Sequence, residues 1–274
     1  MTKREIQEGW QLRCTENEDW ISAVVPGTVY TDLLRSGRIE DPYFKDNEYQ
    51  TKALMEKDYE YRTVITVQDG EFADCDEVFL HFDGIDTVAD VYLNGEHLGS
   101  PCNMHRVWEY RVKQILKEGD NVLSVTLHSP LKFMAEAFKK YGNIGNEDTI
   151  EGFMHLRKAH YMSGWDWGAC LPAAGLFRPV SLLGVKKARL DSVYIRQRHE
   201  EGKVTLLLEV ETELMELDDT DYSYTVTVTD PDGQSQTYEG DPEAIEIHSP
   251  KLWWPNGLGD QPLYTVKVEL FCAG

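Results

Sequence analysis

The residues with the clearest chemical potential are Trp165, Asp166 and Trp167, which stand in the run SGWDWG at positions 163–168. Flat indole faces can stack on the C–H patches of a sugar ring, and a carboxylate accepts hydrogen bonds from sugar hydroxyls. In an extended segment the two indoles point away from the carboxylate, but a twist at the flanking glycines could bring all three toward one cavity. The run therefore predicts a sugar site. The alternative is a core turn of a β-sandwich, with buried tryptophans and an Asp that caps the turn.

The segment before this run forms a small basic island. Residues 153–161 (FMHLRKAHY) combine apolar side chains with Arg157, Lys158 and two histidines, in a chain whose formal net charge is −21. We expect Arg157 to orient Asp166 or a neighbouring carboxylate without itself contacting the sugar. The alternative is that Arg157 and Lys158 pair with acidic groups on the surface.

Other chemistries find no support in the sequence. It contains no phosphate-binding glycine loop and no histidine cluster with metal-ligand spacing, so we expect no cofactor and no metal. A nucleophile elbow is also missing. Asn-Glu pairs occur at 17–18, 47–48 and 146–147, and a Glu after Asn can be the general acid of a glycosidase. Because no apolar strand precedes these pairs, we interpret all three as exposed loop carboxylates.

The net charge and the cysteine pattern restrict the possible binding partners and the possible cellular compartment. The chain has 48 acidic and 27 basic residues, and this charge repels phosphate backbones, so no nucleic acid is expected as a partner. Five widely spaced cysteines without a C-x-x-C pair fit a reducing compartment. Neither a signal-like apolar run at the N-terminus nor a membrane-spanning stretch is evident. We therefore expect a cytoplasmic protein without membrane association.

The pattern of apolar residues predicts an all-β fold in two domains with a boundary near Lys186. In the first domain Asn94-Gly95 predicts a type I′ hairpin. Helical stripes occur at 28–36 and 131–141, and strands are predicted at 59–67, 77–82, 87–93, 121–128 and 178–183. The second domain has short strands of the spacing typical of an immunoglobulin-like sandwich, at 190–196, 203–212, 222–229, 234–238, 244–248 and 263–271.

Several longer motifs follow one another in a specific order. They are residues 25–34 (VPGTVYTDLL), 41–48 (DPYFKDNE), 82–89 (FDGIDTVA) with 91–95 (VYLNG), 157–159 (RKA) leading into 164–168 (GWDWG), and 252–257 (LWWPNG) with 261–264 (QPLY). Together they resemble the N-terminal part of the glycoside hydrolase family 2 β-mannosidases, over essentially the whole chain.

The resemblance implies a galactose-binding-like jelly roll at residues 1–186 and an immunoglobulin-like sandwich at 187–274. In such enzymes a (β/α)8 barrel of about 250 residues follows and bears both catalytic glutamates. We therefore expect no catalytic residue in this chain, which alone would be inactive. Trp165, Asp166 and Trp167 would bind the terminal β-mannoside, and the barrel of a longer chain would be the protein partner.

Three other interpretations remain open at this stage. One is a stand-alone carbohydrate-binding module with a complete aromatic platform. Another is a scaffold sandwich whose tryptophans all lie in the core. A third keeps the family but changes the substrate, because β-galactosidases and β-glucuronidases share it.

Overall fold

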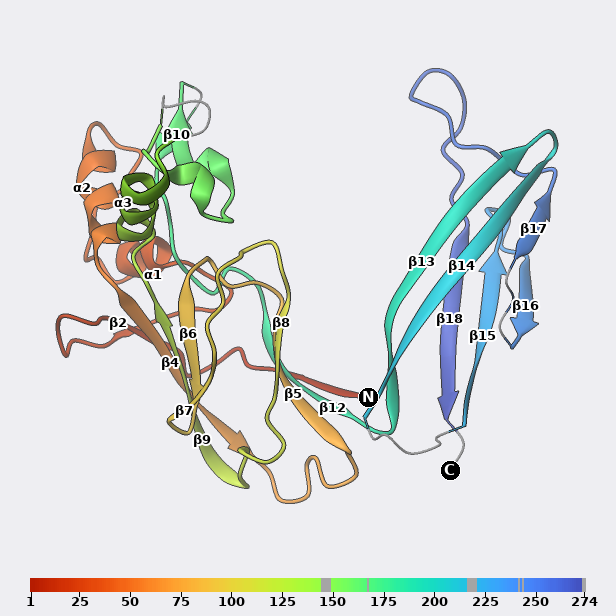
Figure 1. The fold of residues 1–274 in the computed structure, drawn as a ribbon, viewed down its shortest axis with the longest axis horizontal. Coiled ribbons are helices and arrows are strands. Elements are labelled where there is room, and N and C mark those ends of the chain that lie inside the picture. The colour runs from red at the N-terminus through yellow and green to blue at the C-terminus, as the bar shows by residue number, and fades with distance from the viewer. Residues whose placement is uncertain (144–148, 167, 216–220, 241, 243, 273–274) are drawn as a thin grey trace. The chain divides into compact units, whose positions relative to one another are not determined.

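A computed structural model describes residues 1–143, 149–166, 168–215, 221–240, 242 and 244–272. Strands predominate, so the predicted all-β class is confirmed (Figure 1). The chain divides into two compact units, residues 2–184 and residues 185–274 with Met1. Among the described helices, none is long and apolar enough to cross a membrane.

The N-terminal unit is a sandwich of two antiparallel sheets, as expected for a galactose-binding-like jelly roll. The larger sheet has the order β3-β2-β4-β9-β6-β7 and the smaller one β1-β12-β5-β8. Strands of the larger sheet are β2 (Gln11–Cys14), β3 (Ile21–Ser22), β4 (Tyr59–Val67), β6 (Ala89–Leu93), β7 (Glu96–Gly99) and β9 (Gly119–Leu127). Strands of the smaller sheet are β1 (Thr2–Glu5), β5 (Glu77–Phe82), β8 (Trp108–Arg111) and β12 (Val180–Val185).

The alternating sequence of the long strands decides which side chains form the core. In β9 the alternate residues Leu123, Val125 and Leu127 are fully buried, as their spacing predicts. Tyr61 and Ile65 of β4 are buried on the same principle. Each such aliphatic side chain contributes about 1.5–3 kcal/mol by leaving water, so these strands supply much of the stabilisation.

The predicted hairpin turn at Asn94-Gly95 is also confirmed. Both residues have positive φ, 53° and 84°, as a type I′ turn requires, and they join β6 to β7. Asn94 further donates a hydrogen bond to Asn121 at 2.8 Å, which ties the turn to β9.

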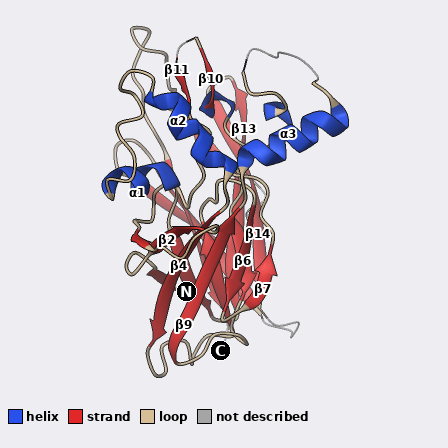
Figure 2. Cartoon of the chain, turned by 90° about the vertical axis from the view of Figure 1, so that its left-hand side faces the viewer, coloured by secondary structure: helices blue, strands red, loops and turns tan. Residues whose placement is uncertain are grey.

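Helices and a short hairpin gather at one end of this sandwich (Figures 1 and 2). Both predicted helices form, and each begins at a hydroxyl cap: Thr28 for the first and Ser129 for the second. Around them lie further short elements. The full set is α1 (Val29–Arg35), α2 (Asn47–Ala53), α3 (Pro130–Tyr141), the 3₁₀ turns η1 (Leu54–Glu56), η2 (Phe153–His155) and η3 (His160–Met162), and the strands β10 (Ser163–Trp165) and β11 (Gly168–Cys170).

The helix α2 corrects one sequence-based interpretation. Asn47 and Glu48 are not exposed loop residues, because they open α2 and are half-buried. The polar sequence NEYQTKA has no apolar stripe, so periodicity gave no sign of a helix there. The pair at 17–18 is exposed and non-helical as predicted, and Glu18 pairs with Arg13 at 3.1 Å. The pair at 146–147 lies outside the described residues.

The C-terminal unit is a smaller sandwich, which agrees with the predicted immunoglobulin-like fold. One sheet has the order β13-β14-β17 and the other β16-β15-β18. The strands are β13 (Ala188–Glu200), β14 (Lys203–Leu214), β15 (Tyr222–Thr229), β16 (Ser235–Glu239), β17 (Ile245–His248) and β18 (Thr265–Cys272). Its core is formed by Val204, Leu206, Val226, Val228 and Ile245. The first strand is longer than predicted and continues past a register shift between Leu190 and Ser192.

His81 lies between two carboxylates, and this arrangement predicts a pH-dependent stability for the N-terminal unit. Glu109, the cross-strand partner of His81, lies 2.7 Å from its Nδ1, and Asp83 lies 2.9 Å from its Nε2. The hydrogen bond to Glu109 is the main reason why the pKa of His81 is raised. A raised histidine pKa stabilises the fold fully below its unfolded pKa of about 6.5, and this stabilisation is lost as pH rises through the folded value.

We therefore expect the melting temperature of this unit to fall as pH increases above about 6.5, and His81→Gln to reduce that fall. Scanning calorimetry of both proteins across this pH range measures the effect. The exposed His105 provides the matched control, His105→Gln, which should keep the wild-type pH dependence. An unchanged pH dependence in His81→Gln would contradict the assignment.

Candidate carbohydrate-binding site

The predicted sugar-binding run forms the hairpin β10–β11. Ser163 pairs with Cys170 and Trp165 with Gly168, and Asp166 follows at the tip. Gly164 is required at its position because its φ is +88° and an added Cβ would lie 2.8 Å from the Cβ of Cys170. The glycine therefore allows the two short strands to approach closely and project the tip.

At the tip the side chains are open to solvent. Trp165 is 38% exposed and Asp166 is also exposed. A buried core turn is therefore the wrong interpretation for Trp165, and so is a scaffold whose tryptophans all lie in the core. Trp167, the third predicted site residue, lies outside the described residues. What the hairpin offers is an accessible indole next to an accessible carboxylate.

Arg157 and Lys158 have opposite environments. Arg157 is exposed, and within the described part of the chain no hydrogen bond or ion pair joins it to Asp166. Its backbone carbonyl accepts a hydrogen bond from Met104 N at 3.0 Å. Lys158 does not pair with a surface acid, which corrects the alternative considered from the sequence. It is only 4% exposed and forms an ion pair with the fully buried Asp86.

The Lys158–Asp86 pair is embedded in further hydrogen bonds. Lys158 Nζ also donates to the carbonyl of Ala173 at 2.5 Å, and the Thr87 hydroxyl donates to Asp86. The backbones of Asp86 and Gly175 exchange two hydrogen bonds, of 2.9 and 2.8 Å. Burial lowers the pKa of the Lys158 ammonium, and the charge of Asp86 opposes that shift. Three segments distant in sequence therefore meet at one buried charge pair.

A second contact ties the hairpin to α2. The carboxylate oxygen Glu48 Oε1 accepts a hydrogen bond from Cys170 N at 2.8 Å. This contact spans 122 residues of sequence. Glu48 belongs to the motif at 41–48, but the contact was not predicted because the helix that carries Glu48 was not predicted. The pairing of Lys158 with Asp86 was not predicted for a related reason: the sequence shows many charged residues but not which of them are buried away from water.

Two cavities flank the hairpin, and they differ in polarity. One, of about 380 Å³, lies toward α2 and is lined by Glu48, Lys52, Thr149, Ser163 and Trp165 among others. The other, of about 440 Å³, lies toward α1 and is lined mainly by apolar and aromatic side chains such as Pro42, Tyr43, Tyr161, Met162 and Leu171. Gly168 borders both cavities. Their sizes fall in the range of small-ligand pockets.

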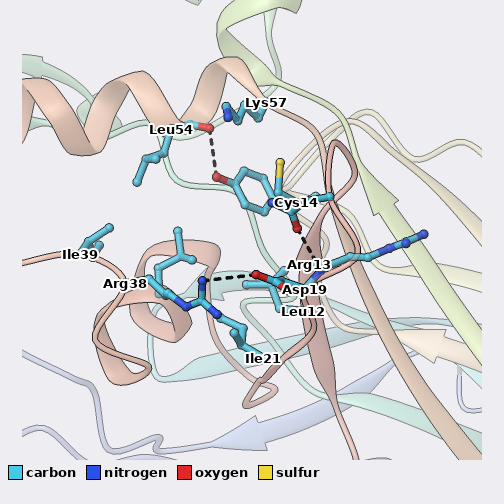
Figure 3. A pocket seen from close by; sticks show the side chains of 12 residues that line it. Leu12, Arg13, Cys14, Asp19, Ile21, Arg38, Ile39, Leu54 and Lys57 are labelled. Carbon is cyan, nitrogen blue, oxygen red and sulfur yellow. Dashed lines mark hydrogen bonds and ion pairs between the residues drawn. The ribbon is translucent and has the colours of Figure 1, made fainter.

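A third cavity lies elsewhere in the unit and offers no comparable site. It measures about 250 Å³ and is bordered by β2, the end of α1 and η1 (Figure 3). Its basic side chains are already neutralised: Arg38 lies 3.7 Å from Asp19, and Lys57 lies 3.1 Å from Glu16. Arg13 likewise pairs with Glu60 at 2.7 Å.

The geometry of the two sandwiches agrees with the comparison to known families. Residues 10–178 match the family described as "Glycosyl hydrolase 2 galactose-binding domain-like". Residues 188–274 match the family "Glycosyl hydrolases family 2". The chain therefore belongs to glycoside hydrolase family 2, as its motifs indicated.

Within this family the similar relatives are named β-mannosidases. β-Mannosidase B of Emericella nidulans is 32% identical over 98% of this chain and 33% of its own length. A probable β-mannosidase of Caenorhabditis elegans is 28% identical over 95% of this chain and 31% of its own length. The predicted resemblance to β-mannosidases is thus confirmed. The chain spans about a third of the length of the curated relatives it matches.

Solved structures give the same result. The β-D-mannosidase of Dictyoglomus thermophilum superimposes with a TM-score of 0.91 at 33% identity, over 99% of this chain and 34% of that one. A β-glucuronidase from an uncultured Clostridium reaches a TM-score of 0.65 at 18% identity, over 98% of this chain and 43% of that one. The second similarity shows a shared fold only.

The buried ion pair leads to a prediction about stability. Removing one partner of a buried pair leaves the other charge without compensation, which typically costs about 3–5 kcal/mol. We expect Lys158→Ala to lower the free energy of unfolding of the N-terminal unit by about this amount. Its neighbour supplies the control: Arg157→Ala changes an exposed residue and should alter stability by less than about 0.5 kcal/mol. Urea unfolding of the three proteins tests both values, and equal effects would contradict the structural distinction.

Proposed function

We propose that this chain is the N-terminal, non-catalytic portion of a retaining exo-β-mannosidase, which hydrolyses terminal β-D-mannosides. The observation that carries the proposal is the hairpin β10–β11, which presents Trp165 and Asp166 to solvent. The identity of over 30% to proteins named β-mannosidase supports the choice of sugar within the family.

In this proposal the chemistry takes place on a barrel outside the 274 residues. Two carboxyl groups about 5–5.5 Å apart would form and then hydrolyse a covalent glycosyl-enzyme. Asp166 would accept hydrogen bonds from hydroxyls of the terminal mannose, and Trp165 would stack on its ring. A group that binds these hydroxyls without transferring a proton still lowers the activation barrier if its hydrogen bonds to them become stronger in the transition state. Asp166 is therefore proposed as a specificity residue and not as a proton donor.

The anchoring of the hairpin base supports this role. The hydrogen bond from Cys170 N to Glu48 and the buried pair of Lys158 and Asp86 hold the segments next to the tip. A binding residue must keep its position to a fraction of an ångström, and such supports reduce the entropy lost when sugar binds. The exposed tip would thus enter a site that a second surface completes.

One prediction concerns Asp166 in the longer protein that contains the barrel. A hydrogen bond to a charged acceptor contributes about 1.5–3 kcal/mol, so Asp166→Ala should lower kcat/KM for an aryl β-mannoside about 10- to 100-fold. The matched control is Asp69→Ala, which changes an exposed aspartate in the turn after β4 and should leave kcat/KM unchanged. Unchanged kinetics of Asp166→Ala would remove Asp166 from the proposed subsite.

A further prediction concerns the chain by itself. If both catalytic carboxylates lie on the barrel, the purified 274-residue chain should not hydrolyse aryl β-mannosides. A sensitive fluorogenic assay with the longer protein as positive control measures this. Hydrolysis of aryl β-mannosides that co-purifies with the 274-residue chain would contradict the proposal that both catalytic carboxylates lie on the barrel.

A further inference from the structure

The polar cavity beside the hairpin has the features of a ligand site that adjoins the exposed tip. It lies between the hairpin and α2, and its volume of about 380 Å³ is enough for one or two sugar units. Trp165 borders it, so the cavity continues directly from the indole assigned to the terminal sugar. Tyr49 of α2 also lines it and is 70% exposed, which adds a second aromatic side chain.

Polar groups in this cavity lack partners, unlike those of the cavity in Figure 3. Among the described residues, no carboxylate lies within 4.0 Å of the ammonium of Lys52, whereas Arg38 and Lys57 in the other cavity are both paired. Within the part of the chain that the structure describes, the hydroxyl oxygen of Thr149 is buried and has no hydrogen-bond partner. A buried hydroxyl without a partner is costly, so the Thr149 oxygen indicates a ligand that supplies the missing hydrogen bond, and the half-buried Lys52 is available to donate to the same ligand.

The carboxylate of Glu48 adds an acceptor to this set. Its Oε1 is occupied by Cys170 N, but its Oε2 takes part in no hydrogen bond among the described residues. The cavity thus combines a donor at Lys52, an acceptor at Glu48 and a hydroxyl at Thr149, next to two aromatic side chains. Such a mixture matches a neutral sugar, whose hydroxyls both donate and accept while its C–H faces stack on aromatic rings.

The apolar cavity on the other side of the hairpin lacks this combination. Its lining includes Asp41, Thr28 and Thr31 but consists mainly of apolar and aromatic side chains, and among the described residues no lysine or arginine borders it. The two sides of the same hairpin therefore differ chemically, and among the described lining residues only the side toward α2 combines a cationic donor with a carboxylate and a hydroxyl.

We propose that the cavity between α2 and the hairpin is a second saccharide subsite, which binds a neutral hexose unit next to the sugar contacted by Trp165. The identity of that hexose as mannose rests on the proposed function, whereas the site itself rests on the cavity. Lys52, Glu48 and Thr149 would bind its hydroxyls, and Tyr49 would cover one face. The ligand class is therefore a neutral oligosaccharide and not a single sugar.

Calorimetric titration of the 274-residue chain with β-linked mannotriose and with mannose tests the proposal. We expect mannotriose to bind more tightly than mannose, and Lys52→Met and Thr149→Val each to weaken mannotriose binding roughly 10-fold. The matched controls are Lys139→Met, at an exposed lysine of α3, and Tyr43→Ala, in the apolar cavity. Both controls should retain wild-type affinity. Circular dichroism melting checks that each variant is folded.

Absence of saturable mannotriose binding, or equal affinities for wild type, Lys52→Met and Thr149→Val, would overturn the subsite. A parallel titration with a β-linked glucose trisaccharide separates this proposal from the proposed function. Binding of the glucose trisaccharide alone, weakened by Lys52→Met, would support the subsite and contradict the mannoside assignment. Because the titration involves no hydrolysis, its result does not depend on catalytic activity.

Discussion

The buried ion pair between Lys158 and Asp86 is the interaction on which the architecture around the hairpin depends. Removing two charges from water is expensive, and the cost is offset only when the pair is close and its other polar atoms are hydrogen-bonded. Here Ala173 and Thr87 satisfy those atoms. The pair therefore fixes three segments in one arrangement: the segment before the hairpin, the loop after β5 and the segment before β12. Any other arrangement of these segments would leave a buried charge without a partner.

The hairpin combines a fixed base with an exposed tip. Gly164 permits close approach of its strands, and the bond from Cys170 N to Glu48 attaches it to α2. Trp165 and Asp166 remain open to solvent, whereas Gly164 and the Lys158–Asp86 pair are buried and Glu48 is half-buried. Exposed polar and aromatic groups on a rigid support are typical of binding sites, because binding then orders few additional groups.

The parts of the fold that could be predicted from sequence are those in which local patterns and tertiary structure agree. Alternation in β4 and β9, positive φ at Asn94-Gly95 and the hydroxyl caps of α1 and α3 all depend on neighbouring residues. The helix α2 and strands such as β10 and β11 were not predicted. These elements are short or polar, so their own sequences show no periodic apolar pattern. They are stabilised by contacts with distant segments.

The sequence by itself determined the two-sandwich class, the family and the chemical character of the run around Asp166. These follow from residue types and spacing, which fold context does not change. Only the tertiary structure decided that Lys158 is buried and Arg157 exposed, although they are adjacent in sequence. It also decided that Glu48 supports the hairpin and that Lys52 borders a polar cavity. The reason is physical: loss of water and the choice of partner depend on segments that meet only after folding.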